Sequence, residues 1–167
     1  MRDNIKKIAL SSVFAALVFI ATAYLPRVPF PGGYIHLGDV FIYIAACILP
    51  LPYSAVSAAA GAAAADILTG YMIWAPATFV VKAALAALFS SKNEKFICKK
   101  NIAAIFFALF VSIGGYYFYE ALIISSFAVA LESVPFNLMQ GIGSGALFVL
   151  LGLAFDRTAL KKKIYGK

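Results

Sequence analysis

Residues 74–89 of the chain, WAPATFVVKAALAALF, are apolar enough to cross a membrane, yet they carry one charge, Lys82, near the middle. A charge at the centre of a bilayer costs at least ~2.5–3.5 kcal/mol on insertion scales, so such groups usually face a partner, a cavity or a ligand. The stretch predicts a membrane helix and makes the surroundings of Lys82 the main functional question.

The whole chain has the composition of a membrane protein. Its 167 residues are 63% hydrophobic and 13% charged, with a mean hydropathy of +0.93. Soluble domains average about 45–50% apolar and ~25% charged residues. We therefore expect an all-α integral membrane protein with a single membrane domain over residues 1–167. A span of ~20 residues leaves room for about six helices.

Six membrane helices are predicted, at about residues 8–25, 37–49, 53–68, 74–90, 102–127 and 134–155. The second and third are shorter than the ~20 residues of an ideal crossing. The third is rich in alanine, and small residues let membrane helices approach closely. We therefore expect the third helix to lie near the centre of the bundle.

Basic residues predict the orientation. Twelve of the fourteen Lys and Arg residues precede the first span, separate the fourth from the fifth, or follow the sixth. With six crossings these regions share one side, which the positive-inside rule assigns to the cytoplasm. Both termini are then cytoplasmic, in a multi-pass protein of the plasma membrane.

Two other interpretations of the charged regions are less favoured. The N-terminal basic residues, the apolar run and Ala21-Thr22-Ala23 resemble a signal peptide, but the run is long and its removal would break the charge pattern. The net charge of +7 does not indicate nucleic-acid binding, because the basic residues flank apolar segments and form no stripe on a folded face.

The remaining polar groups gather in the outer half of the bundle. At ~1.5 Å per residue, Lys82 lies roughly 12 Å below Trp74 at the outer interface. Glu120, Asn137 and Gln140 fall at a similar level, and Asp39 and Asp66 lie at the outer ends of their helices. The inner half has almost no such groups. This asymmetry favours an outward-facing pocket over a continuous ion path. The candidate binding residues are Lys82, Glu120, Asn137, Gln140, Trp74, Tyr117, Asp66, His36 and Tyr34.

Each candidate also has a structural interpretation. Lys82 and Glu120 could form a buried ion pair that fixes helix register and binds nothing. Asp66 could satisfy the following turn, and Asp39 could cap the second helix. His36 could make a local hydrogen bond, and the tyrosines could form an interfacial belt.

Four segments resemble one family. These are GGYIHLGD at 32–39, AADILTGY at 64–71, WAPATFVVK at 74–82 and VPFNLMQG at 134–141. Together they are similar to the substrate-binding (S) components of energy-coupling factor (ECF) vitamin transporters. The resemblance implies six helices with cytoplasmic termini. It also implies a vitamin site near the outer face, formed by spans four to six and capped by the loop between spans one and two.

The resemblance further implies partners: a membrane coupling (T) subunit and two ABC ATPases, with the S component toppling to deliver its cargo. Family members dock through an Ala-x-x-x-Ala pattern on the first helix, matched here by Ser12 and Ala16. An ordinary packing face inside the bundle is the alternative for these two residues. The chain has no Gly-x-x-x-x-Gly-Lys-Ser/Thr loop for ATP, so energy must come from partners.

The leading hypothesis is a subunit that binds a small water-soluble vitamin and uses no cofactor. The alternative is a self-contained secondary transporter or channel, which needs an inward route. We do not expect an enzyme, because His36 is the only histidine and no nucleophile–base pair is visible. The spacing of Cys47 and Cys98 does not suggest a metal site. Riboflavin, a pyridoxine-like ring, a thiamine precursor, pantothenate and a corrinoid all stay open as ligands.

Overall fold

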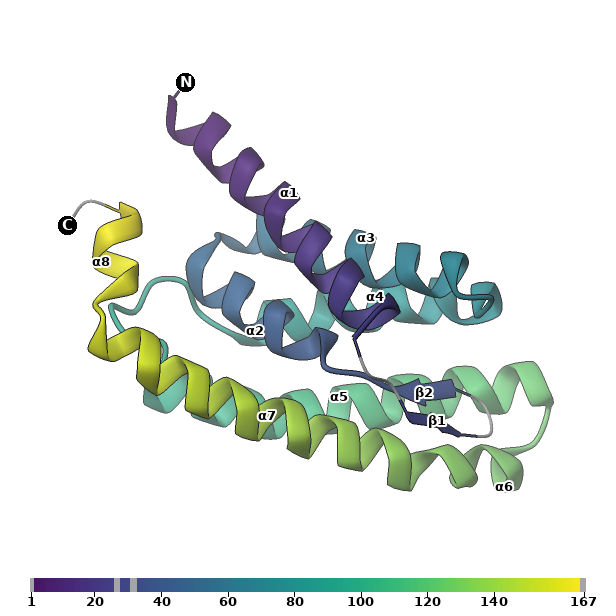
Figure 1. Ribbon diagram of the computed structural model, residues 1–167. Coiled ribbons are helices and arrows are strands. Elements are labelled where there is room, and N and C mark those ends of the chain that lie inside the picture. Colours follow the sequence, from purple (N-terminus) through teal and green to yellow (C-terminus); the bar gives the residue numbers. More distant parts are fainter. Residues whose placement is uncertain (1, 26–27, 31–32, 166–167) are drawn as a thin grey trace.

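The computed structural model describes residues 2–25, 28–30 and 33–165, which are almost entirely helical (Figure 1). The elements in chain order are α1 (Arg2–Ala23), β1 (Val28–Phe30), β2 (Gly33–Ile35), α2 (Gly38–Ile48), α3 (Leu51–Leu68), the 3₁₀ turn η1 (Met72–Trp74), α4 (Ala75–Leu88), α5 (Lys99–Ile124), α6 (Phe127–Ala130), the 3₁₀ turn η2 (Leu131–Ser133), α7 (Val134–Arg157) and α8 (Leu160–Tyr165).

The helices are those of a membrane protein. Among the described residues, four segments are long and apolar enough to cross a bilayer: Asp3–Ala23, Leu51–Leu68, Lys99–Ile124 and Phe127–Arg157. Two shorter apolar helical segments accompany them, Gly38–Ile48 and Met72–Leu88. The expected helical membrane fold is thus present, and length alone singles out four spans rather than six.

Several boundaries differ from those expected. Helix α1 begins at Arg2, well before the predicted start at residue 8. Helix α5 ends at Ile124 because Ser125 adopts a left-handed backbone with φ of 56°, and the Ser126 hydroxyl then accepts a hydrogen bond from Val129 N and caps α6. The antiparallel pair β1–β2, which pairs Val28 with Ile35, lies where we expected only a loop.

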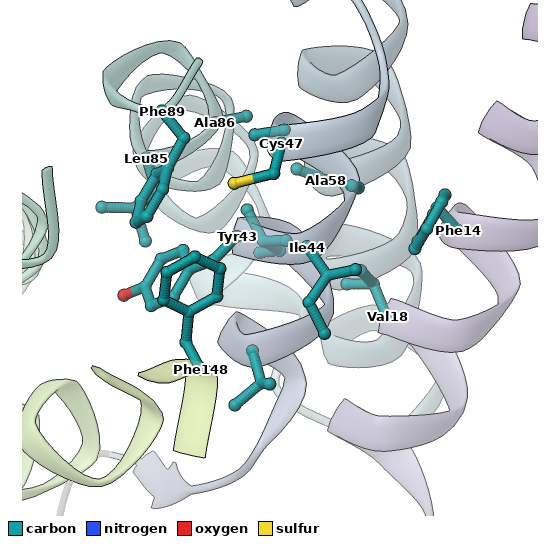
Figure 2. Close-up of a cluster of buried hydrophobic side chains, with 14 of the residues drawn as sticks. Phe14, Val18, Tyr43, Ile44, Cys47, Ala58, Leu85, Ala86, Phe89 and Phe148 are labelled. Carbon is teal, nitrogen blue, oxygen red and sulfur yellow. The ribbon is translucent and has the colours of Figure 1, made fainter. Parts of the chain in front are cut away.

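The central helix of the bundle is α2. Ten of its eleven residues are buried, and it packs against α1, α3, α4 and α7. Figure 2 shows Tyr43 directed toward Phe89 and Phe148, whereas Ile44 points toward Val18 on α1. The rings of Tyr43 and Phe89 stack with centroids 4.5 Å apart. Neighbouring helices thus cover α2 on nearly every side.

Helix α3 is therefore not the centre that its alanines suggested. Its Ala60 and Ala64 are exposed, while its other face packs closely on α1 and α4. A Cβ added at Gly61 would lie 2.4 Å from the carbonyl oxygen of Ala15, so only glycine permits this approach of α1. The small residues of α3 determine how closely the helices approach, not which helix is innermost.

The two ends of the bundle differ in chemistry. The β1–β2 hairpin lies at one end and α8 at the other (Figure 1). At the α8 end, Lys6 Nζ donates to the Ile164 carbonyl and so joins the first and last helices. There Asp156 accepts hydrogen bonds from Phe96 N at 2.7 Å and Ile97 N at 3.0 Å, which fixes the α4–α5 connection to α7. Toward the hairpin end lie the buried polar side chains of His36, Asp39, Asp66, Lys82, Glu120 and Gln140.

Candidate binding site

A pocket opens at the hairpin end, where α3, α4, α5 and α7 meet the hairpin. It contains about 450 Å³ of space between atoms, its mouth included. The residues that line it are Tyr34, His36, Asp66, Tyr71, Trp74, Thr78, Tyr116, Glu120, Ser133, Asn137 and Gln140. Aromatic rings and hydrogen-bonding groups thus share one wall, as small-molecule sites require.

Helical spacing aims the polar side chains inward. On α5, Tyr116 and Glu120 are four residues apart and therefore lie on one face. On α7, Asn137 and Gln140 are three apart and share a face in the same way. The Tyr116 hydroxyl and Thr78 Oγ1 are 3.1 Å apart, which links α5 to α4 across the pocket wall.

The hairpin is fastened over the pocket by two polar contacts. The Tyr34 hydroxyl donates to Asp66 Oδ1 at 2.8 Å, and the Tyr34 ring lies 4.8 Å from that of Tyr71. The backbone N–H of His36 donates to Gln140 Oε1 at 3.1 Å. These contacts tie the connection between α1 and α2 to both α3 and α7.

Lys82 lies beneath the pocket rather than in its wall. Its Nζ is 2.6 Å from Asp39 Oδ1, and the two side chains are 0% and 1% exposed. Gln140 Nε2 donates to the other Asp39 oxygen at 3.0 Å, so the pair is joined to the pocket wall. Nζ also lies 5.3 Å from the centre of the Tyr116 ring, a cation–π distance.

Two structural roles considered from the sequence, an ion pair of Lys82 with Glu120 and a helix cap by Asp39, are wrong. The partner of Lys82 is Asp39, not Glu120, because the first turn of α2 faces α4 while Glu120 lies in the pocket lining above. Asp39 does not cap its helix, since α2 begins after Leu37 without a side-chain cap. A buried carboxylate and a buried ammonium satisfy each other here.

The pocket is narrow in this conformation. The centre of a water molecule can move through only about 50 Å³ of it. That space holds a few waters, since one needs ~10–15 Å³ by this measure. A ligand of vitamin size therefore requires the lining side chains or the hairpin to move outward.

Seven of the nine predicted binding residues line the pocket, and Lys82 and Tyr117 do not. Tyr117 instead packs against Phe118 and Phe127, with ring centroids 5.4 and 6.1 Å away. Tyr116, the preceding residue on α5, lines the pocket instead. The lining residues that the sequence left out are Tyr71, Thr78, Tyr116 and Ser133.

Comparison with known proteins decides the family. The model of the family described as ECF-type riboflavin transporter, S component, matches residues 2–157 of the chain. The chain belongs to this family. No curated protein matches it. Members of the S-component family are subunits of vitamin-uptake transporters in membranes, not a family of enzymes.

In this S component, the residues expected to dock a partner lie on the outside of the bundle. Ser12 and Ala16 are both exposed on α1, and the Ser12 hydroxyl donates to the Ile8 carbonyl of its own helix at 3.1 Å. The alternative, a packing face inside the bundle, does not fit these exposed positions.

Proposed function

We propose that the chain is the substrate-binding subunit of a riboflavin importer. It binds riboflavin in the pocket at the hairpin end and delivers it inward with a T subunit and two ABC ATPases. The family match supports the vitamin and the partners. The lining of the pocket is the observation that carries the proposal.

Riboflavin joins a flat tricyclic ring to a chain of hydroxyl groups. Tyr34, Tyr71, Trp74 and Tyr116 offer aromatic faces for such a ring. The hydroxyl, amide and carboxylate groups of the remaining lining residues offer donors and acceptors for the ring edge and the polyol. A pocket lined only by aromatic side chains would suit an apolar ring, and one lined only by hydrogen-bonding groups would suit a sugar.

Orientation supports uptake from outside. With six crossings, the positive-inside rule places the Lys-rich α8 end in the cytoplasm and the pocket toward the outer face. Below the pocket lie the buried ion pair and the apolar core around Tyr43, which close the way inward. Transport therefore requires a rearrangement driven by partners, whereas a self-contained transporter needs an inward path.

Binding can be measured on the purified chain in detergent. Trp74 is the only tryptophan of the chain and lines the pocket, so riboflavin bound there should quench its fluorescence. Tyr116→Phe removes a hydroxyl from the pocket wall, and Tyr117→Phe removes one from the neighbouring residue outside it. Because one hydrogen bond contributes about 0.5–1.5 kcal/mol, we expect Tyr116→Phe to weaken binding by roughly threefold to tenfold.

Tyr117→Phe is the matched control and should leave the affinity unchanged. Equal effects of the two substitutions, or an absence of quenching by riboflavin at micromolar concentration, would contradict the proposed site. Liposomes that contain only this chain should not accumulate riboflavin. Accumulation without ATPases would favour the self-contained transporter instead.

A further inference from the structure

A second cavity lies at the opposite end of the bundle, near α8. It contains about 1180 Å³ of space between atoms, its mouth included, and the centre of a water molecule can move through about 570 Å³ of it. It is lined by Pro50, Ser91, Lys92, Asn93, Glu94, Lys161 and Lys162. The riboflavin proposal makes no use of this cavity. Three of its seven lining residues are lysines, and only one is acidic.

Hydrogen bonds hold the walls of this cavity in place. Lys161 is 5% exposed, and its ammonium group donates to the Ser91 carbonyl at 3.3 Å and to the Asn93 carbonyl. It also lies 5.6 Å from the centre of the Phe96 ring. Lys161 therefore fastens the α4–α5 connection to α8, and the cavity is bounded by fixed backbone.

The other two lysines stand at the mouth. Lys92 is exposed, and Lys162 is 57% exposed and lies 3.9 Å from a carboxylate oxygen of Glu94, which is itself 82% exposed. A solvent-exposed ion pair of this length contributes little to stability, so a stronger anion can displace Glu94. Burial lowers the pKa of Lys161, while Cys47 and Asp156 oppose this effect. The two exposed lysines are thus the groups that can receive an anion.

The position of the cavity indicates where that anion comes from. Pro50 immediately precedes the membrane helix α3, and α8 follows the membrane helix α7, so the cavity lies at the level where those helices leave the bilayer. Leu51, next to Pro50, is 52% exposed. Exposed apolar and basic groups side by side at a membrane boundary suit a lipid, whose chain and headgroup need both.

We propose that this cavity binds the phosphate group of an anionic membrane lipid, with Lys92 and Lys162 contacting the phosphate and Lys161 holding the wall. The site depends on the predicted cytoplasmic position of the Lys-rich end, where anionic lipid headgroups attract basic residues. It does not depend on which vitamin the outer pocket takes.

The test is native mass spectrometry of the full chain in a neutral detergent, with three probes. These are short-chain phosphatidylglycerol, short-chain phosphatidylcholine, and glycerol 3-phosphate as the soluble source of a phosphate group. The cavity variant is Lys92→Gln with Lys162→Gln. The matched control is Lys99→Gln with Lys100→Gln, two exposed lysines at the start of α5 that do not line the cavity.

We expect the wild-type chain to retain phosphatidylglycerol in preference to phosphatidylcholine and glycerol 3-phosphate. The cavity variant should bind phosphatidylglycerol roughly thirtyfold more weakly, since each of the two lysines near an anionic surface contributes about 1 kcal/mol. The control variant should bind it like the wild type. Glu94→Gln should strengthen binding, a change that loss of folding cannot produce.

Equal weakening in the cavity and control variants would show only general attraction to basic residues and would overturn the proposed site. Glycerol 3-phosphate binding as tightly as the lipid would overturn the lipid as the source of the phosphate. An unchanged affinity in the cavity variant would exclude Lys92 and Lys162 as contacts.

Discussion

Replacing Lys82 by methionine should destabilise the bundle more than it alters the pocket. The ion pair with Asp39 has a Nζ–Oδ1 distance of 2.6 Å, and the side chains are 0% and 1% exposed. At an effective dielectric constant of about 20, unit charges at that distance attract by about 6 kcal/mol. Removing one partner of a buried pair typically costs about 3–5 kcal/mol, because the other charge stays buried.

Methionine fills most of the volume of lysine, so packing changes little. Asp39 keeps its hydrogen bond from Gln140 Nε2 at 3.0 Å, which partly compensates the carboxylate. We therefore expect the free energy of unfolding to fall by about 3 kcal/mol, the lower end of the range for removing one partner of a buried ion pair. Unfolding in mixed micelles with increasing dodecyl sulfate, followed by Trp74 fluorescence, measures this quantity.

The double variant Lys82→Met with Asp39→Asn removes both charges and keeps an acceptor for Gln140. It should regain stability to within about 1 kcal/mol of the wild type, since replacing both ions of a buried pair is often neutral. A single Lys82→Met variant within ~0.5 kcal/mol of the wild type, the range of ordinary surface substitutions, would refute this reasoning.

Three further outcomes are expected. Gly61→Ala should lose roughly 1–3 kcal/mol of unfolding free energy, because its Cβ would press on an α1 carbonyl, whereas Gly143→Ala, with nothing within 4 Å, should lose none. Ala16→Leu should reduce co-purification with the T subunit and ATPases in a pull-down, and Ala60→Leu, an exposed alanine on α3, should not. Tyr34→Phe removes the hydrogen bond that fastens the hairpin, so stopped-flow fluorescence should show faster riboflavin release; unchanged release would argue against the hairpin as the cover.

The sequence was most informative about depth. Hydropathy located the apolar helices, and counting residues from the outer end of each helix placed Asp66, Glu120, Asn137 and Gln140 in the outer half of the bundle. All of these lie in the lining of one pocket. A rise of ~1.5 Å per residue is a property of every helix, so this inference needs no knowledge of packing.

Rotation about each helix axis was harder to predict. Tyr116 and Tyr117 differ by ~100° around α5, and only the packing of α5 against α4 decides which one faces the pocket. Lys82 lies at the right depth but faces α2, where Asp39 is placed by the start of that helix. Thr78 lies one turn before Lys82, so that spacing was a signal for a further residue on the same face.

The central helix was missed because small residues indicate where helices approach closely, not which helix is innermost. Ala-rich α3 packs closely on one side, whereas α2 is enclosed by α1, α3, α4 and α7. Its composition does not specify this position, because apolar side chains can equally face lipid. The hairpin was also missed, although the sequence Pro31-Gly32, a dipeptide typical of turns, separates the two short strands. Three-residue strands are too short for an alternating pattern to be recognised.

The length of α2 has a consequence for ligand size. With eleven residues it rises only about 16 Å, roughly half of the ~30 Å hydrocarbon layer. No residue of α2 lines the pocket, but because α2 begins only at Gly38, after the hairpin, it leaves the space that the hairpin and the pocket occupy. The length of α2 therefore limits the depth of the pocket. One added turn, about 5.4 Å, would make the chamber shallower without changing a single residue of its wall.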